Sequence, residues 1–465
     1  MSAAVSAERD GHDSSAGRSD LVVVVGGGFA GLSAASVLAE YGKRVLVVDA
    51  RAQLGGRATA FRDRETGELV DNGQHVLFGC YRATLEFLER IDASDRVRVQ
   101  PSLAVPYVDR AGRRSVLQCP RLPSPLHLLA GVLGWGGIPW RDRMSVLKLA
   151  GPLRRARLEL QRTGSVTADP DGTVSDWLIA HGQRETLRQW LWDPLAIAAL
   201  NQSPAAAAAS PFVRVLAQMF GPDPRDSALV LPVRPLHEMY AEPARTFIES
   251  RGGEVRVHAL ARVLVEDGRV SAVDIRGDRI ATRHVISAVP WFDLGRLFSP
   301  APPELGSLLA SAGRMESMPI VTVNLWYDSR VMNDAFIGLP GREMQWVFDK
   351  RIAFGGDASH LSLVSSGATR LTSMSREELT ALAAREVEEA IPSARRDRLL
   401  RATVVREKHA TFSLAPGEPA RPPTKTAVHG LYLAGDWIDT GLPGTIESAV
   451  VSGHRAAREL LKADC

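Results

Sequence analysis

Residues near the start of the chain have the types and spacing that bind the phosphate groups of a nucleotide. Three glycines have the spacing G-x-G-x-x-G: Gly26, Gly28 and Gly31. They lie between the β-branched run Leu21–Val25 and a helical segment that ends near Tyr41. In such a loop the first glycine permits a tight turn, the second lets the backbone approach a pyrophosphate, and the third packs helix on strand. The helix begins with Phe29 and Ala30, whose free N–H groups would face the phosphates.

A carboxylate follows at the position that a ribose requires. Asp49 lies 18 residues after Gly31 and ends a second apolar run, Lys43–Val48. At the end of a strand in this position, a carboxylate can accept hydrogen bonds from ribose hydroxyls. Strand, glycine loop, helix, strand and acid together predict a dinucleotide-binding βαβ unit. The glycine spacing alone is also compatible with an ordinary glycine-rich loop.

A second pair of glycines stands just beyond the acid and favours FAD over NAD. The segment Ala50–Ala58 begins with Ala50 and Arg51 and contains the run Gly55, Gly56 and Arg57. An NAD-dependent enzyme with this fold has no use for a glycine pair and an arginine at this point. The alternative is an ordinary Gly-Gly turn with a solvated arginine.

Residues near the C-terminus also have types and spacing suited to binding a nucleotide. Gly430–Ala434 predicts a strand that leads directly into Gly435 and Asp436. A helix is predicted from about Thr445 to Leu461, and three residues surround its start: Gly444, Thr445 and Ile446. The N-terminus of a helix offers N–H groups and the positive end of a dipole to a negatively charged group.

The two ends of the chain together resemble amine oxidases, carotenoid desaturases and Rab GDP-dissociation inhibitors. The resemblance implies a non-covalently bound FAD, with Arg57 and its glycines at the diphosphate and Asp436 at the ribityl hydroxyls. The helix that begins near Thr445 would then face the N1/O2 edge of the flavin. Ala261 matches the position whose backbone meets the adenine in these families, where valine is more frequent.

A narrower resemblance begins in the segment Val70–Tyr81, which includes Gly73, Gln74 and His75. This segment is similar to one in the bacterial hydroxysqualene dehydroxylases, whereas carotenoid desaturases have a proline near Gln74. Further blocks agree with the same family: Trp192–Leu195, Ala199–Asn201, Ala288–Pro290, Pro319–Val323, Gln345–Asp349, Arg406–Phe412 and Ala434–Pro443. The resemblance implies reduction of hydroxysqualene to squalene with reduced FAD, in hopanoid or sterol biosynthesis.

Loss of an allylic hydroxyl requires an acid, because the hydroxyl leaves as water and a delocalised cation remains for hydride transfer. His75 is the first candidate, since its segment is expected to pass the isoalloxazine and a histidine can be protonated near neutral pH. A structural histidine bonded to a backbone carbonyl is the alternative. Asp439, just after the Gly-Asp turn, is the second candidate.

The predicted fold is α/β, α+β overall, with a Rossmann-like FAD-binding domain of the glutathione-reductase or amine-oxidase type and a discontinuous, inserted substrate domain. The expected segments are a disordered tail (1–20), three FAD-binding parts (21–100, 246–290 and 401–465) and two substrate-domain parts (101–245 and 291–400). Strands are expected at Glu254–Val265 and Arg269–Ile275, and a short helix at Ala205–Ala209.

Composition limits the partners and the location. The chain has 465 residues and a net charge of +3, so no basic surface points to nucleic acid. Its three cysteines, Cys80, Cys119 and Cys465, have no metal-ligand spacing, and no metal is expected. No run of 18 apolar residues occurs, so a cytoplasmic protein is expected, with peripheral association at the inner face of the cell membrane as an option. No second glycine motif could hold NAD(P)H, which favours a separate flavin reductase as electron donor.

The apolar segment Pro125–Trp140 is a candidate for a membrane-facing entrance for an isoprenoid lipid; a buried core segment is the alternative. Three tryptophans are expected in the core or in a pocket wall: Trp177, Trp190 and Trp192. A desaturase or another flavin oxidase is the rival enzyme, although no tyrosine pair suggests an aromatic cage. A non-catalytic carrier of prenylated lipids is the rival from another class.

Overall fold

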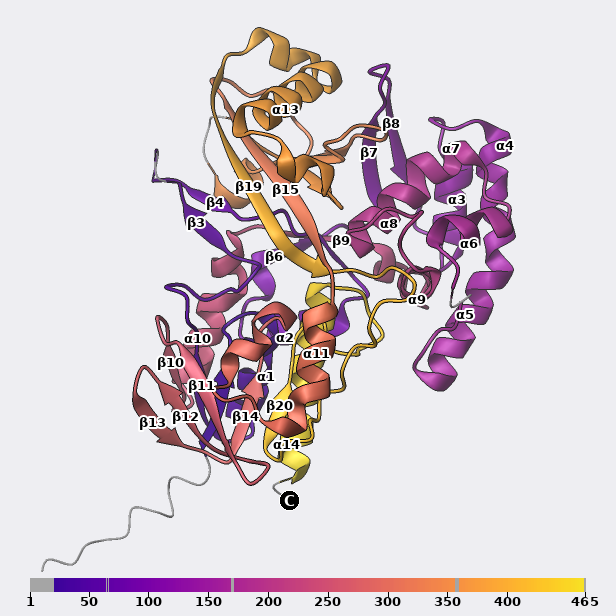
Figure 1. Cartoon of the computed structure of the whole chain (residues 1–465). Helices are drawn as coiled ribbons and strands as arrows, with labels where there is room; N and C mark the ends of the chain where they lie inside the picture. The colour runs from indigo at the N-terminus through magenta and orange to yellow at the C-terminus, as the bar shows by residue number, and fades with distance from the viewer. Residues whose placement is uncertain (1–20, 64, 66, 169–170, 356–358, 464–465) are drawn as a thin grey trace, which may run out of the picture.

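A five-stranded parallel sheet forms the base of the molecule (Figure 1). Its order is β10-β2-β1-β14-β20, and its strands are β10 (Glu254–Arg256), β2 (Arg44–Val48), β1 (Leu21–Val25), β14 (His284–Ser287) and β20 (Leu431–Leu433). The four consecutive valines of β1 are buried because helices and further chain cover both faces of this sheet. The computed structural model describes residues 21–463 except 64, 66, 169–170 and 356–358, so the expected tail 1–20 lies outside the described residues.

Two helices from opposite ends of the chain pack against each other beside this sheet. They are α1 (Phe29–Glu40) and α14 (Ile446–Ala463). Their contact is close because Gly453 has no side chain: a Cβ there would lie 2.2 Å from the carbonyl oxygen of Ala30. The start of α14 therefore lies next to the glycine loop, as the predicted FAD-binding fold requires.

A three-stranded antiparallel sheet follows β10 and consists of β11 (Ala261–Glu266), β12 (Arg269–Ile275) and β13 (Asp278–Ala281). The prediction of one continuous strand over Glu254–Val265 was therefore wrong. The chain breaks at His258, whose φ of 54° is left-handed, and the amide of His258 donates to the carbonyl of Arg51. The two halves of the expected strand belong to different sheets.

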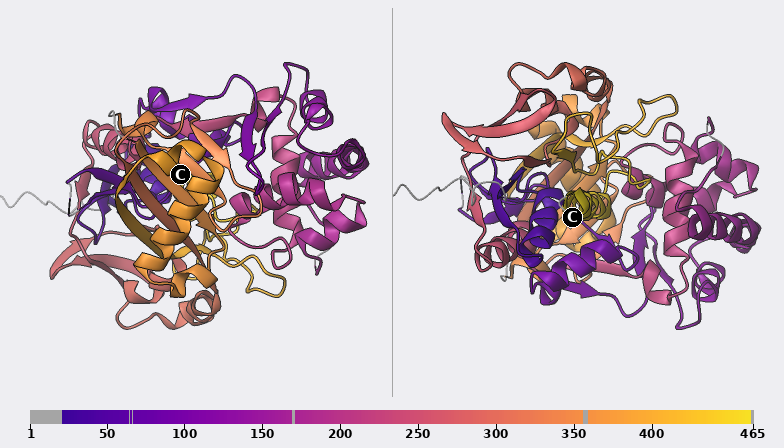
Figure 2. Two further views of the ribbon diagram at one scale, coloured as in Figure 1. Left: turned by 90° about the horizontal axis from the view of Figure 1, so that it is seen from above. Right: turned by 90° about the horizontal axis from the view of Figure 1, so that it is seen from below.

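A seven-stranded sheet lies above the parallel sheet, with the order β19-β15-β18-β17-β16-β7-β8. Its strands are β19 (Leu399–Phe412), β15 (Ser317–Tyr327), β18 (Ser359–Ser366), β17 (Trp346–Asp349), β16 (Phe336–Gly338), β7 (Ala104–Val108) and β8 (Arg114–Gln118). Helix α13 (Arg376–Ala390) covers one face, and Figure 2 shows it lying across the strands. Successive side chains of a strand alternate between faces. Val321, Val323 and Leu325 accordingly pack toward α13, and Thr322, Asn324 and Trp326 point to the other face.

The helices of the inserted part gather at the end of this sheet near β7 and β8 (Figure 1). The main ones are α3 (Leu126–Gly134), α5 (Ala150–Thr163), α6 (Val174–Ala180), α8 (Asp193–Leu200) and α9 (Ala209–Met219). The short helix predicted at Ala205–Ala209 does not form before Ala209. The amide of Ala208 donates to the carbonyl of Leu414 and that of Ala209 to the carbonyl of Gly172, so tertiary contacts override the helix propensity of alanine.

One expected segment boundary falls inside a strand of the seven-stranded sheet. Residue 401 was expected to start the third FAD-binding part, but it lies inside β19, which pairs with β15 along most of its length. We propose that this part instead starts after Phe412. Among the described residues, no helix is long and apolar enough to cross a membrane.

Candidate active site

Two glycines of the loop between β1 and α1 have different surroundings. A Cβ on Gly31 would lie 1.9 Å from the carbonyl oxygen of Gly26, so helix and loop are already in contact there. A Cβ on Gly28 would instead meet only the backbone of Gly56, at 3.7 Å. The two predicted glycine motifs therefore lie against each other backbone to backbone, with no side chain between them, as the close approach of a diphosphate to the backbone requires.

Asp49 lies at the end of β2 with both carboxylate oxygens held by backbone donors. Oδ2 accepts from the amide of Gly27 at 2.7 Å, and Oδ1 accepts from the amide of Arg51 at 2.8 Å. A carboxylate has about four acceptor positions, so both oxygens can also accept from ribose hydroxyls. The backbone bonds fix the orientation of the carboxylate before any nucleotide binds.

The Gly-Gly-Arg turn rests on a tyrosine that sequence reasoning missed. The hydroxyl of Tyr240 donates to the carbonyl of Gly55 at 2.7 Å, and its ring stacks on Phe29 at 3.6 Å between centroids. Phe29 thus contributes its backbone to the helix start and its side chain to the core. Arg51 donates to the carbonyl of Gly56 at 2.7 Å and closes the same turn from outside. No sequence motif surrounds Tyr240, so only the fold identifies its role.

Arg57 connects the two ends of the chain. Its guanidinium forms an ion pair with Asp436, donates to the carbonyl of Ala410 at 2.9 Å and lies 5.4 Å from the ring centroid of Trp291. Asp436 is buried, so it depends on this partner. The amide of Gly435, the preceding residue, donates to Ser452 of α14 at 2.7 Å. The arginine and the acid predicted to bind FAD are therefore adjacent.

The start of α14 lies beside this cluster, because the hydroxyl of Ser448 donates to the carbonyl of Asp436 at 3.0 Å. The helix begins at Ile446, and the hydroxyl of Thr445 accepts from the amide of Ser448 at 3.2 Å. Gly444 packs closely on β19, because a Cβ there would lie 3.1 Å from Cβ of Thr411. Ala261, predicted at the adenine, is the first residue of β11 and is buried.

These features fit FAD. The backbone at Gly28 and Gly56 would hold the diphosphate, Asp49 the ribose, Asp436 the ribityl chain and the start of α14 the pyrimidine edge of the flavin. All four come from the ends of strands or the starts of helices in one parallel sheet, where nucleotides bind in folds of this kind.

The segment Val70–Tyr81 is tied to this cluster and to the seven-stranded sheet. Asn72 donates to the carbonyl of Arg57 and accepts from the amide of Thr59, which fixes the segment against the Gly-Gly-Arg turn. On its other side, Nζ of Lys350 donates to Oδ2 of Asp71 at 2.7 Å and to Oε1 of Gln74 at 2.8 Å.

Lys350 follows β17 and is only 3% exposed, and Asp71 is 5% exposed. A buried charge pair is costly to desolvate and is severely destabilised when one partner is removed. Sequence reasoning missed Lys350, although the resemblance block Gln345–Asp349 ends one residue before it. The pair places an ammonium group beside the segment predicted to pass the flavin.

The environment of His75 opposes its protonation. The pKa of His75 is lowered to about 4, chiefly by burial; the negative charge of Asp71 opposes this lowering, and the positive charges of Lys350 and Arg57 add to it. At neutral pH the imidazole is therefore neutral in this geometry. A neutral imidazole can still donate or accept a hydrogen bond, but its remaining N–H is far too weak an acid to protonate a leaving hydroxyl.

Asp439, the second candidate acid, lies in a different environment. Its side chain is 63% exposed and its Oδ1 lies 3.7 Å from a guanidinium nitrogen of Arg421. The same oxygen accepts from the amide of Gly441 at 3.1 Å. These contacts tie Asp439 to the turn before Leu442 and to Arg421.

Several of the remaining resemblance blocks meet at Asn201, the residue after α8. Its side chain donates to the carbonyl of Met318 on β15 and to Thr411 on β19, both at 3.0 Å, and accepts from the amide of Gly367 after β18 at 2.7 Å. Asn201 has a left-handed φ of 52°, which asparagine tolerates better than most residues. These blocks therefore join the helical part to the seven-stranded sheet.

Comparisons with known proteins agree with this fold and site. The family described as "Flavin containing amine oxidoreductase" matches residues 29–461. A hydroxysqualene dehydroxylase of Sinorhizobium fredii is 30% identical over 94% of this chain and 97% of its own length. A hydroxysqualene dehydroxylase of Zymomonas mobilis is 25% identical over 93% of this chain and 97% of its own length. A 15-cis-phytoene desaturase of Capsicum annuum is 24% identical over 95% of this chain and 78% of its own length.

Solved structures support the fold alone, because their sequence identities are low. An oxidoreductase from Methanosarcina mazei superposes with a TM-score of 0.73 at 17% identity and covers 94% of this chain and 100% of its own. A putrescine oxidase variant superposes with a TM-score of 0.71 at 18% identity and covers 96% of this chain and 99% of its own.

The fold and the site define an FAD-dependent flavoprotein oxidoreductase. The chain belongs to the flavin-containing amine oxidoreductases and, within that superfamily, to the hydroxysqualene dehydroxylase family. The predictions of the fold, of an FAD-dependent enzyme and of the family are thereby confirmed.

Proposed function

We propose that this enzyme reductively removes the hydroxyl group of hydroxysqualene and releases squalene and water. Relatives named for this activity match over nearly the whole chain. In the balanced reaction the substrate gains a hydride and its hydroxyl gains a proton, so C–O is broken and C–H is formed. Reduced FAD, when bound, supplies the hydride.

The observation that carries this proposal is the buried ammonium of Lys350 beside Gln74. Dehydroxylation needs a proton for the leaving hydroxyl, whereas desaturation of a hydrocarbon removes hydrogen and needs no acid for a leaving group. A lysine held between Asp71 and the amide oxygen of Gln74 is an acid in a water-poor place. We therefore assign the proton to Lys350 and give the neutral His75 an orienting role.

The other residues position the reaction. Arg57 and Asp436 hold the two ends of the chain around the cofactor, and Asn72 fixes the segment that carries Gln74. Apart from releasing and regaining the Lys350 proton, the protein binds and orients its partners.

One experiment separates this proposal from a phytoene-type desaturase, the second candidate, which the match to plant desaturases favours. Anaerobic holoenzyme with reduced FAD is given hydroxysqualene, and in a parallel sample oxidised holoenzyme is given phytoene. Squalene from the first sample supports dehydroxylation. If the second sample yields a polyene and the first yields no squalene, the enzyme is a desaturase and the dehydroxylase proposal is wrong.

We further propose that the lipid arrives from the inner face of the cell membrane and that a separate reductase or free reduced flavin supplies electrons. Exposed apolar side chains in and near the segment Pro125–Trp140 support arrival of the lipid from the membrane. Leu126 and Trp140 are 54% and 63% exposed, with Met144 and Leu147 exposed nearby, whereas Trp135 is buried. Flotation of wild-type protein and a Leu126→Ser/Trp140→Ser variant with anionic liposomes tests the point. Equal recovery with both proteins would contradict it.

A further inference from the structure

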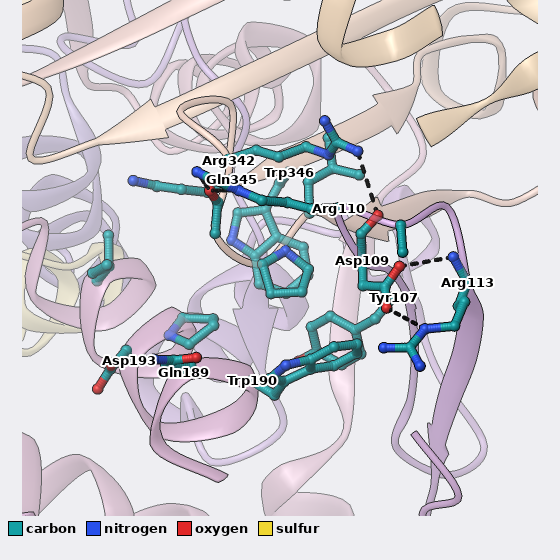
Figure 3. A pocket seen from close by; sticks show the side chains of 16 residues that line it. Tyr107, Asp109, Arg110, Arg113, Gln189, Trp190, Asp193, Arg342, Gln345 and Trp346 are labelled. Atoms are coloured by element: carbon teal, nitrogen blue, oxygen red, sulfur yellow. Dashed lines mark hydrogen bonds and ion pairs between the residues drawn. The ribbon is translucent and has the colours of Figure 1, made fainter. Parts of the chain in front are cut away.

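A cavity of about 720 Å³ lies between the helical part and the seven-stranded sheet (Figure 3). Its walls come from the β7–β8 hairpin, from the start of α8 and the turn before it, and from the loop between β16 and β17. Three aromatic side chains form much of the wall: Tyr107, Trp190 and Trp346. Cavities of this volume with mainly apolar walls are typical binding sites for small molecules.

The aromatic wall is rigid. The ring of Tyr107 lies 6.0 Å from Trp346, 6.4 Å from Trp190 and 5.2 Å from the buried Trp135, measured between centroids. Aromatic pairs at these separations stabilise each other beyond simple burial. The wall therefore presents a fixed apolar surface and needs no ligand to assemble it.

The charged groups at the cavity are already paired within the protein. Arg113 forms an ion pair with Asp109 at 2.7 Å, and Arg110 donates to the carbonyl of Gly341. Arg342, which lines the cavity, forms an ion pair with Glu389, which does not line it. Burial also raises the pKa of Asp193, which favours its neutral form. Such groups leave an apolar interior and do not form a receptor for a phosphate.

Strand β17 leads from this cavity to the reaction site. Trp346 lines the cavity, Phe348 lies on the same face two residues on, and the amide of Lys350 continues the ladder to the carbonyl of His360. Phe336 of β16 packs on both aromatic rings, at 6.2 Å and 5.8 Å. Four residues of extended chain span about 13 Å. The cavity thus lies a few residues along β17 from the Lys350–Gln74 contact, and the buried rings of Phe336 and Phe348 stand between the two.

A second cavity of about 490 Å³ adjoins the first. The two share Arg113 and Trp190, and the second is lined by Gly136–Pro139, just before the exposed Trp140. The segment Pro125–Trp140 therefore lines a cavity that shares two wall residues with the aromatic cavity.

We propose that the larger cavity is the subsite for one isoprenoid arm of the lipid substrate, with the arm lying along β17 and the carbinol carbon at the Lys350 end. The assignment rests on the proposed function for the identity of the lipid. The ligand class is a neutral branched hydrocarbon chain, and the arginines at the rim bind no part of it.

A matched pair of variants in α8 tests this subsite. Ile197 lines the cavity, and the next residue, Ala198, is exposed. In the FAD-loaded enzyme, Ile197→Trp fills the cavity and is expected to raise KM for hydroxysqualene at least tenfold, with a smaller change in kcat. Ala198→Trp is expected to leave both unchanged. An unchanged KM in a folded Ile197→Trp enzyme would overturn the subsite.

Photolabelling of wild-type holoenzyme provides a readout that needs neither turnover nor variants. The probe is a diazirine-tagged farnesyl chain presented in phosphatidylcholine vesicles. Labels on peptides that contain Trp190 or Trp346, lost on addition of squalene, support the subsite even if hydroxysqualene is not converted, in which case the proposed function alone fails. Labels confined to other peptides, or protection by inorganic diphosphate instead of squalene, would overturn it even in an enzyme that converts hydroxysqualene.

Discussion

Arg57 and Asp436 stand 379 residues apart in sequence and form an ion pair at the centre of the site. Through this pair the Gly-Gly-Arg turn near the N-terminus meets the Gly-Asp turn that precedes the last helix. Both groups belong to patterns from which the sequence predicts FAD contacts. The pair therefore joins the two halves of the cofactor site, and its loss should be seen first in cofactor binding.

Arg57→Ala should weaken FAD binding at least tenfold, about 1.4 kcal/mol, because it leaves a buried Asp436 without its partner. Titration of apoprotein with FAD, followed by flavin fluorescence, measures the dissociation constant. Arg62→Ala is the control, since Arg62 is exposed and donates to the carbonyl of Gly67. Equal affinities for the two variants would contradict the role of Arg57.

Two glycines of the same loop should respond differently to alanine. Gly31→Ala places a Cβ 1.9 Å from a backbone oxygen, so it should destabilise the apoprotein by roughly 1–3 kcal/mol. Gly28→Ala meets no atom closer than 3.7 Å and should keep the stability of the apoprotein but lose FAD binding. Chemical denaturation and FAD titration of both variants provide the comparison. FAD bound normally by Gly28→Ala would show that the diphosphate lies elsewhere.

Lys350→Met should slow substrate-dependent oxidation of the reduced flavin about 10²- to 10⁴-fold, the usual effect of losing a general acid. The double variant Lys350→Met/Asp71→Asn removes the unpaired buried charge and should restore stability without restoring the rate. Stopped-flow absorbance of the flavin and thermal denaturation report the two effects separately. Full activity in Lys350→Met would remove the assignment, whereas His75→Gln, which removes only an orienting group, should slow the reaction far less than Lys350→Met.

Stability should fall in acid because of a buried histidine in α14. Burial lowers the pKa of His454 to about 4, and the positive charge of Arg90 adds to the effect. The unfolded chain binds a proton at about 6.5, so the stabilising contribution of the neutral ring is present above pH 6.5 and is lost as the pH falls toward 4. The loss is on the order of 3 kcal/mol.

His454→Gln keeps an acceptor for Arg90, which donates to the ring at 3.2 Å in the native chain. The variant should therefore show a shallower fall of unfolding free energy between pH 6.5 and 4. Urea denaturation across that range tests it. Parallel pH profiles for variant and wild type would contradict the assignment.

Much of the cofactor site could be predicted from sequence because its chemistry is local. The loop around Gly28, the acid Asp49 and the start of α14 each depend on a few consecutive residues. The neutral state of His75 could not be predicted, because it results from burial and from charges that folding brings near. Lys350 was missed for the same reason: it is 276 residues away from Gln74 in sequence and has no motif of its own.

The errors in secondary structure also have tertiary causes. The expected strand Glu254–Val265 is interrupted because residues after β10 turn back to bond the end of β2, where the amide of Ala259 donates to the carbonyl of Asp49. The alanine run Ala205–Ala209 favours a helix by composition, but its last amides are taken by Leu414 and Gly172. In both places long-range hydrogen bonds outweigh local preference.

The most direct measurement of the central claim is a single turnover of the reduced holoenzyme with hydroxysqualene under anaerobic conditions. We predict that the flavin becomes oxidised and that one equivalent of squalene forms per flavin. A flavin that stays reduced, or one that is oxidised without squalene, would contradict the assignment of this enzyme as a reductive dehydroxylase.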